Sequence, residues 1–420
     1  MRRLSDSDLV AATPITPWQL SEISERSVDK KVEPKKLVAP STLVVAGLFA
    51  GVGGLEEGFR QAGHKATMLC ERDPLARRVL ARHFADTELT TDVTLLKGLP
   101  DCDVLTAGFP CQDLSQVGQR RGITGPNSGL IGAVFELLNR QSALPRWIVL
   151  ENVPFMLSLD RGSAIRAVTR ALEILGYAWA YRTIDARAFG LPQRRRRIVL
   201  LASRDGDPRP ALLGSDAGAP DAKARGLHAC GFYWTEGNTG LGWAVDSVPP
   251  LKGGSALHIP SPPAIWFPRR RLIATPAIED AERLQGFKAG WTDLSDEEPR
   301  SAGKRWRMVG NAVSVPMAKW IAKRLTAETK DFETGEIVEL PRDASWPAAG
   351  WGMNGVRARS DVSEWPVQRK QKHLAGFLEY KVNPLSKKAT SGFLSRLVDS
   401  CLKYEKSFAR DLAHHAKNAD

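Results

Sequence analysis

The cysteine at position 111 lies where a predicted buried strand ends and a polar loop begins, within the segment DVLTAGFPCQDLSQVGQRRG. A thiolate is a strong nucleophile, and α/β proteins place their ligands at the carboxyl ends of strands. Pro110 restricts the backbone just before the cysteine, and the loop QVGQRRG is basic and glycine-flanked, like a mobile lid over a polyanion. A single buried cysteine is more often a small apolar core residue. Its position nevertheless makes Cys111 a candidate nucleophile.

An acid and two arginines follow or precede other predicted strands. Glu151 comes directly after the apolar run WIVL, where a carboxyl group is poorly suited to ending a strand without another role. Further along, QRRRR leads into the apolar run IVLLAS, and alternation along a strand sends Arg195 and Arg197 to the same face. A run of arginines is more commonly a solvated surface, and that alternative stays open at this point.

The segment GLFAGVGG follows the first predicted strand and opens the first predicted helix. Its glycines allow close approach of backbone to a ligand and leave free N–H groups at the helix start. Glu71, twenty residues after Gly51, ends the next strand, where a carboxylate can accept hydrogen bonds from ribose hydroxyls. Asp92 lies at the following strand region, within reach of an adenine edge. A simple tight turn is the alternative, but together these features predict an adenosine-containing cofactor.

Extended and helical patterns alternate from about residue 41 to residue 204. Apolar runs predict strands at 41–49, 65–71, 102–109, 146–153 and 196–203, and helical spacing predicts helices at 54–63, 74–84, 128–141 and 163–177. This alternation predicts a parallel sheet with helices on both faces.

The pattern stops at about residue 205. Glycine, proline and tryptophan are frequent from there to residue 270, which predicts a smaller, irregular, β-rich domain. Helical spacing returns at 275–287 and 314–328, and a polar segment after 331 becomes a basic, helical tail. The predicted units are an N-terminal arm (1–40), a cofactor-binding and catalytic domain (41–204), the β-rich domain (205–270), a return to the first domain (271–330) and a C-terminal extension (331–420).

Composition narrows the class of protein. The chain has 420 residues and a formal net charge of +12, which favours a polyanionic partner. Five scattered cysteines without a CxxC pair argue against a disulfide framework and a zinc site, so no metal is expected. We expect a reducing, cytoplasmic location, because the N-terminus lacks the apolar core of a secretory signal and the chain lacks an apolar run that could cross a membrane.

Six motifs occur in order at the ends of these elements: FAGVGG, GFPCQDLS, ENV, QRRRR, ERLQGF and GNAVSVP. As a set they are highly specific, and over residues 43–203 and 271–327 the chain resembles the cytosine-C5 DNA methyltransferase family. The resemblance implies an α/β fold built on a Rossmann-like, S-adenosylmethionine-dependent methyltransferase sheet. It also implies S-adenosyl-L-methionine as cofactor, double-stranded DNA as partner, and residues 205–270 as the target recognition domain.

The resemblance also assigns the chemistry. Cys111 would add to C6 of a cytosine flipped out of the duplex, and the activated C5 would take the methyl group. Glu151 would hydrogen-bond the N3 edge of the base and protonate N3, which burial of the carboxyl group encourages. Arg197 would hold the O2 of the base, and Arg195 would lie near the cysteine or the phosphate.

Other residues are assigned by the same resemblance. The loop 116–122 would close over the DNA, and Asn311 implies that the last helix returns beside the first strand. The cofactor pocket would be lined by Phe49, Gly51, Gly54, Glu71, Asp92, Pro110, Leu130 and Asn311. The substrate would contact Gln112, Ser115, Arg120, Arg121 and Asn152.

Two positions depart from the family pattern. Gly47 stands where the family usually has an acidic residue, which removes a hydrogen-bonding side chain on the cofactor side. Pro250-Leu251 is the nearest match to a Thr-Leu pair that normally ends the recognition region, so the phosphate contact of that threonine is missing.

Three alternatives have discriminating features. An enzyme methylating cytosine in RNA shares the motifs, although the glycine-rich insert and basic tail fit DNA better. A non-catalytic binding protein would not need the set Cys111, Glu151, Arg195 and Arg197. A nucleotide-dependent oxidoreductase would leave GFPCQ and ENV without a role.

A stand-alone chain with one compact recognition region resembles bacterial restriction–modification enzymes. We therefore expect a monomer that protects host sites from a separately acting restriction endonuclease. For residues 331–420, a DNA-gripping helix pair and a solvated tail are both open.

Overall fold

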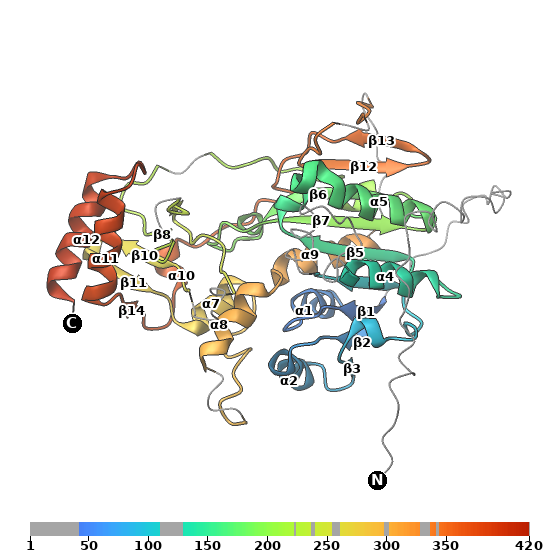
Figure 1. Cartoon of the computed structure of the whole chain (residues 1–420), viewed down its shortest axis with the longest axis horizontal. Coiled ribbons are helices and arrows are strands. Elements are labelled where there is room, and N and C mark those ends of the chain that lie inside the picture. The colour runs from blue at the N-terminus through green and yellow to red at the C-terminus, as the bar shows by residue number, and fades with distance from the viewer. Residues whose placement is uncertain are drawn as a thin grey trace, which may run out of the picture.

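A computed structural model describes residues 42–109, 129–221, 224–236, 240–253, 261–297, 302–327, 337–341 and 344–419. These residues form two sheets that lie side by side and are joined through a group of helices (Figure 1). Within the described part of the chain no helix is long and apolar enough to span a membrane.

The larger sheet has nine strands in the order β13-β12-β6-β7-β5-β4-β1-β2-β3. The strands are β1 (Val44–Leu48), β2 (Lys65–Cys70), β3 (Glu88–Thr90), β4 (Val104–Ala107), β5 (Trp147–Asn152), β6 (Ala178–Asp185), β7 (Arg196–Ser203), β12 (Ala349–Met353) and β13 (Val356–Arg359). Strands β3, β2, β1, β4 and β5 pair in parallel, so their carboxyl ends meet at one edge. This confirms the predicted α/β sheet for its first half.

The prediction of an all-parallel sheet is wrong for the second half. Strand β7 lies between β5 and β6 and pairs antiparallel to both. The sequence pattern missed β6, whose residues AWAYRTID follow the fourth predicted helix directly. No crossover helix separates β6 from β7, and only such a crossover would have allowed the two neighbouring strands to run parallel.

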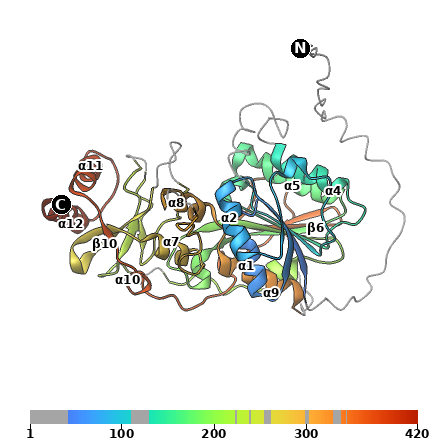
Figure 2. The same ribbon diagram turned by 90° about the horizontal axis from the view of Figure 1, so that it is seen from below.

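Helices cover both faces of the large sheet (Figure 2). One face packs against α4 (Gly129–Asn139) and α5 (Ser163–Ile174), and the other against α1 (Gly54–Gln61), α9 (Val315–Thr326) and α6 (Arg209–Leu212). Helix α2 (Pro74–His83) agrees with the predicted helix at 74–84, and it begins with proline after the capping residue Asp73. Short 3₁₀ turns are η2 (Val93–Leu95), η4 (Pro154–Leu157), η5 (Leu159–Gly162), η6 (Ala186–Phe189) and η7 (Pro268–Arg270).

Helix α9 lies directly on α1, which confirms that the chain returns beside the first strand. Two glycines of α1 permit the close approach. A Cβ at Gly54 would lie 2.4 Å from the carbonyl oxygen of Val313, and one at Gly58 would lie 2.4 Å from the Cβ of Ala318. The sequence GLEEG therefore sets the distance between the two helices.

The smaller sheet has five antiparallel strands in the order β14-β11-β10-β8-β9. They are β8 (Cys230–Phe232), β9 (Ala244–Val245), β10 (Ala264–Phe267), β11 (Leu272–Thr275) and β14 (Asn383–Pro384). Helices α7 (Ile278–Leu284) and α8 (Ala302–Asn311) follow β11 and lie between the two sheets. The short, irregular strands have the β-rich character expected after residue 205. The predicted bounds 205–270 differ from the structure, because α6 packs on the large sheet and β11 and β14 lie beyond residue 270.

The C-terminal residues are distributed differently from the expected separate extension. Strands β12 and β13 lengthen the large sheet beside β6, whereas β14 pairs with β11 of the small sheet. In the chain, the short helix α10 (Leu374–Phe377) lies between β13 and β14. Helices α11 (Lys387–Val398) and α12 (Lys406–Asn418) follow β14. Phe393 and Phe408 are buried against Phe232 and Trp266 of the small sheet. Apolar burial of this kind excludes a solvated tail for the two last helices.

Candidate active site

The candidate site lies where β4 and β5 end side by side. The chain leaves β4 through Gly108 and Phe109, and a Cβ at Gly108 would lie 3.8 Å from Oε2 of Glu151 on β5. The amide of Asn152 donates to the carbonyl oxygen of Phe109 at 3.1 Å and its oxygen accepts from the N–H of Val153 at 2.8 Å. These bonds hold the two strand ends together.

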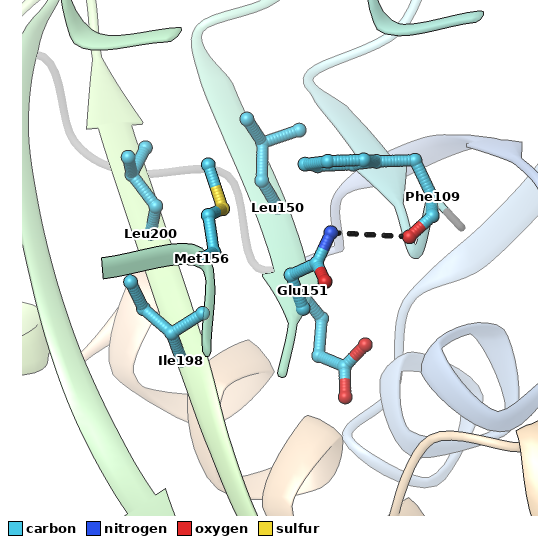
Figure 3. Close-up of a pocket in the computed structure, with 7 residues that line it drawn as sticks. Phe109, Leu150, Glu151, Met156, Ile198 and Leu200 are labelled. Atoms are coloured by element: carbon cyan, nitrogen blue, oxygen red, sulfur yellow. Dashed lines mark hydrogen bonds between the residues drawn. The ribbon is translucent and has the colours of Figure 1, made fainter. Parts of the chain in front are cut away.

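Strand alternation separates the apolar and the polar parts of this site. Phe109, Leu150, Met156, Ile198 and Leu200 line a small apolar pocket, and the carboxylate of Glu151 points away from them (Figure 3). Because Leu150 faces the helices α4 and α5, its neighbour Glu151 is directed to the opposite face of the sheet.

Glu151 is buried beside two arginines. Its Oε1 lies 2.9 Å from Nε of Arg197 in an ion pair, and Arg195 adds a second positive charge. Burial raises the pKa of the Glu151 carboxyl group, and the two arginines oppose this rise without cancelling it. As alternation along β7 predicts, Arg195 and Arg197 share this face, whereas Arg196 pairs with Glu364.

The side chain of Arg195 is buried, and its guanidinium donates hydrogen bonds to three backbone carbonyl oxygens. Its Nη1 donates to the carbonyl oxygen of Leu251 at 3.0 Å, and its Nη2 donates to Gly310 at 3.1 Å and Ala312 at 2.8 Å. Desolvation, reinforced by Arg197, holds the pKa of the Arg195 guanidinium well below its ordinary range. Arg195 thus ties the large sheet to the end of the β-rich insert and to α8.

The departure at Pro250-Leu251 lies at this junction. The N–H of Leu251 donates to Oε1 of Gln193 at 3.0 Å, and the hydroxyl of Tyr233 donates to the carbonyl oxygen of Pro250 at 2.8 Å. Both residues act through their backbone groups, which proline and leucine supply as well as other residues do. Gln193 opens the QRRRR motif but was given no role from the sequence, and no local pattern distinguishes Tyr233.

The glycine loop after β1 has unusual backbone geometry. Phe49 has a φ of 55° and Gly51 a φ of 57°, and a Cβ at Gly51 would meet open space. A left-handed non-glycine residue at such a loop is strained, and strain of this kind gathers at ligand sites. The N–H of Gly51 donates to Oε2 of Glu71 at 2.8 Å, whereas Asp92 accepts from the N–H and hydroxyl of Thr94.

The remaining predicted cofactor residues occupy different settings. Gly54 faces Val313 and serves the packing of α1, as described above. Leu130 is half-buried against the core beneath α4, and Asn311 is exposed at the end of α8, next to Gly253. The predicted site residues Pro110, Cys111, Gln112, Ser115, Arg120 and Arg121 lie outside the described residues.

Glu56 is a buried carboxyl group that sequence reasoning did not single out. It lies on α1, is 1% exposed, and accepts a hydrogen bond from the hydroxyl of Thr106 on β4 at 2.8 Å. The available signal was an acid on the sheet-facing side of an amphipathic helix, between Leu55 and Phe59.

One cluster of potential metal ligands occurs among the described residues: His228, Asp246 and His373. The Asp246 carboxylate already accepts hydrogen bonds from Nδ1 of His373 at 2.8 Å and from the N–H of Leu374 at 2.8 Å. These bonds fasten the segment before α10 to the β-rich insert.

Similarity to known proteins decides the class of this site. Residues 43–220 match the family described as C-5 cytosine-specific DNA methylase. The Type II methyltransferase M2.BsuMI of Bacillus subtilis (strain 168) is 45% identical over 364 residues, which cover 84% of this chain and 92% of that protein. The chain belongs to the C-5 cytosine-specific DNA methylase family. This confirms the resemblance carried by the motifs, and it makes the chain a cytosine-C5 DNA methyltransferase.

Two further similarities are consistent with this family. The Type II methyltransferase M.MspI of Moraxella sp is 30% identical over 194 residues, covering 44% of this chain and 46% of that protein. The crystal structure of the S. pombe Dnmt2 methyltransferase superposes with a TM-score of 0.51 at 17% identity, covering 67% of this chain and 98% of the other. The latter shows likeness of fold alone and confirms the predicted fold class.

Proposed function

We propose that this methyltransferase transfers a methyl group from S-adenosyl-L-methionine to C5 of a cytosine flipped out of a short, specific sequence in double-stranded DNA. The observation that carries the proposal is the buried carboxyl group of Glu151 beside Arg197, at the point where the chain leaves β4 toward Cys111. Cys111 follows Phe109 by two residues in the sequence, and the carbonyl oxygen of Phe109 accepts a hydrogen bond from Asn152, the neighbour of Glu151.

The residue types account for each part of the reaction. The Cys111 thiolate adds to C6 and forms an S–C6 bond, and the displaced ring electrons are taken up as N3 receives a proton from Glu151. The ring is then nucleophilic at C5. After methylation, loss of the C5 proton to water and departure of the thiolate restore the aromatic ring.

The electrostatics support these roles. Because burial raises the pKa of Glu151, this carboxyl group holds its proton to higher pH than an exposed glutamate does. We assign Arg197 to the O2 of the cytosine, where its charge would stabilise the electron density that builds on the ring. Arg195 holds the β-rich insert and the end of α8 through its three backbone acceptors.

The glycine loop fits the cofactor. Open space at Gly51, the strained Phe49 and the acid Glu71 lie together at the carboxyl ends of β1 and β2. S-adenosyl-L-methionine supplies an electrophilic methyl group when bound. Phe49, Gly51, Gly54, Glu71, Asp92, Pro110, Leu130 and Asn311 would hold it, with Phe49 offering an aromatic face to the adenine or the sulfonium.

The small sheet is assigned to target recognition, and the relatives support a modification enzyme. A β-rich domain beside the catalytic edge can present loops to the major groove, where each base pair has its own pattern of donors and acceptors. In the loop after β4, Gln112, Ser115, Arg120 and Arg121 would contact DNA, as would Asn152 of β5. Both named relatives are Type II methyltransferases, so we propose that this chain protects DNA from a separately acting restriction endonuclease.

The test is transfer of labelled methyl groups from S-adenosyl-L-methionine into plasmid DNA and, in parallel, into total RNA. Base-resolution mapping should show 5-methylcytosine at one short recurring DNA sequence. The variant Cys111→Ala should still bind cofactor and DNA but transfer no methyl group, and residual transfer would overturn the assignment of the nucleophile. Label found only in RNA would overturn the DNA substrate.

A further inference from the structure

The Glu56 carboxyl group fills the space that Gly47 leaves empty on β1. A Cβ at Gly47 would lie 2.5 Å from Oε1 of Glu56, so a side chain at position 47 and this carboxyl position exclude each other. The carboxyl group sits between β1 and β4, one residue before the carboxyl ends of both strands, and just below the loop 49–53. The family pattern has an acidic residue at position 47 on β1. In this chain an acidic side chain lies near that position, but it is Glu56 of helix α1.

Among the residues that the structure describes, no positive charge compensates a Glu56 carboxylate. Its Oε1 accepts from Thr106, and within the described part of the chain its Oε2 is buried without a hydrogen-bond partner. The charged groups on the surrounding elements are engaged elsewhere or repel it: Glu57 of α1 pairs with Arg60, and the ammonium group of Lys319 on α9 donates to Gln61.

A second acid adds to the negative potential of this region. Glu71, at the end of β2, interacts unfavourably with a Glu56 carboxylate. Desolvation is the larger effect, and together they raise the pKa of Glu56 to about 7. β1 and β4 contribute no titratable side chain, because their sequences are VVAGL and VLTA. A buried acid in this state ionises more readily when a cation approaches.

We propose that Glu56 is a positioning residue whose carboxylate favours the cationic cofactor S-adenosyl-L-methionine over its neutral product S-adenosyl-L-homocysteine, so that this preference increases with pH. The inference rests on the proposed cofactor. The two molecules differ at the sulfur, which carries a positive charge only before methyl transfer. Preference for the charged form would help product to leave and fresh cofactor to enter.

The same geometry explains Gly47 in this chain. An aspartate at position 47 would overlap the Glu56 carboxyl group, and two adjacent buried acids would also repel each other. Gly47 with Glu56 thus places one acidic group beneath the glycine loop, as an acidic residue at position 47 would in the family pattern.

Calorimetric titration of the full-length protein with each molecule separately, at pH 6 and pH 8.5, tests the proposal. The amino groups of the two molecules titrate differently, because the sulfonium charge lowers the pKa of its own amino group, so Glu56→Gln supplies the baseline. Relative to that variant, the preference of the wild type for S-adenosyl-L-methionine should rise with pH by up to about tenfold, since Glu56 goes from mostly neutral to mostly ionised.

Three further variants guard against a trivial loss of folding. Gly47→Asp alone should weaken binding of both molecules, whereas Gly47→Asp combined with Glu56→Ser should restore the preference for S-adenosyl-L-methionine. Glu136→Gln, an exposed change on α4, should leave the ratio and its pH dependence as in the wild type. An unchanged pH dependence in Glu56→Gln would overturn the role of Glu56. Binding of neither molecule by the wild type would overturn the cofactor assignment itself.

Discussion

The buried acid on α1 makes a prediction about stability that needs no ligand. Glu56 has a pKa near its ordinary 4.5 in the unfolded chain and about 7 in the folded protein. Each pKa unit corresponds to about 1.4 kcal/mol, so ionisation at high pH should cost the folded state about 3 kcal/mol. Below pH 4.5 the Glu56 carboxyl group is neutral in the folded and in the unfolded state, so it does not lower the stability. Because folding raises its pKa, the unfolded chain ionises first, and the free energy of unfolding falls as pH rises through 7.

Replacing Glu56 by glutamine removes this titration and keeps the acceptor for Thr106. The variant should therefore gain stability relative to the wild type as pH rises from 5 to 8.5, by about 3 kcal/mol in total. An unpaired amide N–H would lower the stability of the variant by about 1 kcal/mol at every pH, so the change with pH is the quantity to measure.

The assay is differential scanning calorimetry of wild type and variant across this pH range. The difference between their melting temperatures should grow by roughly 3–4 °C for a chain of this length. The exposed control Glu136→Gln should stay within about 1 °C of the wild type at both ends of the range. A constant difference between Glu56→Gln and the wild type would refute the inference that Glu56 titrates near neutral pH.

Three further outcomes are expected. Gly58→Leu should separate α1 from α9, because a Cβ at Gly58 already meets Ala318 at 2.4 Å, and urea unfolding should show a loss of several kcal/mol. Arg305→Met should cost about 3–5 kcal/mol by the same assay, because it leaves the buried carboxylate of Glu282 without its 2.9 Å ion pair. Adding Glu282→Gln should recover part of this loss, because glutamine removes the buried charge and keeps an acceptor for the N–H of Gly290 or Thr292. Deleting residues 386–420 should expose the apolar face of the small sheet and abolish DNA binding in a gel-shift assay, while calorimetry should still detect cofactor binding.

Local sequence patterns were sufficient for most elements of the large sheet. The apolar runs at β1, β2, β4, β5 and β7 and the helical spacing at α1, α2, α4, α5, α7 and α9 all correspond to observed elements. Each of these segments has its own periodicity or its own start and stop residues, and that information is carried by neighbours in the chain.

Strand pairing was decided by the tertiary structure. The direction of β7 depends on the absence of a helix between it and β6, and β6 lacks a strong apolar alternation of its own. The strands of the C-terminal region were equally hard to predict from the sequence. Strands β12, β13 and β14 are short and are stabilised by the strands with which they pair. Such elements have little local signal for a sequence pattern to detect.

The chemistry of the site divides in the same way. The order of residues along the chain already shows which side chains are available and at which strand ends: Cys111 after β4, Glu151 on β5, and Arg195 and Arg197 at the start of β7. Contacts between distant segments bring Arg195 to three backbone carbonyls and place Glu56 in the space over Gly47. Charge states and hydrogen-bond partners of buried groups depend on what surrounds them in space, and those neighbours come from distant parts of the chain.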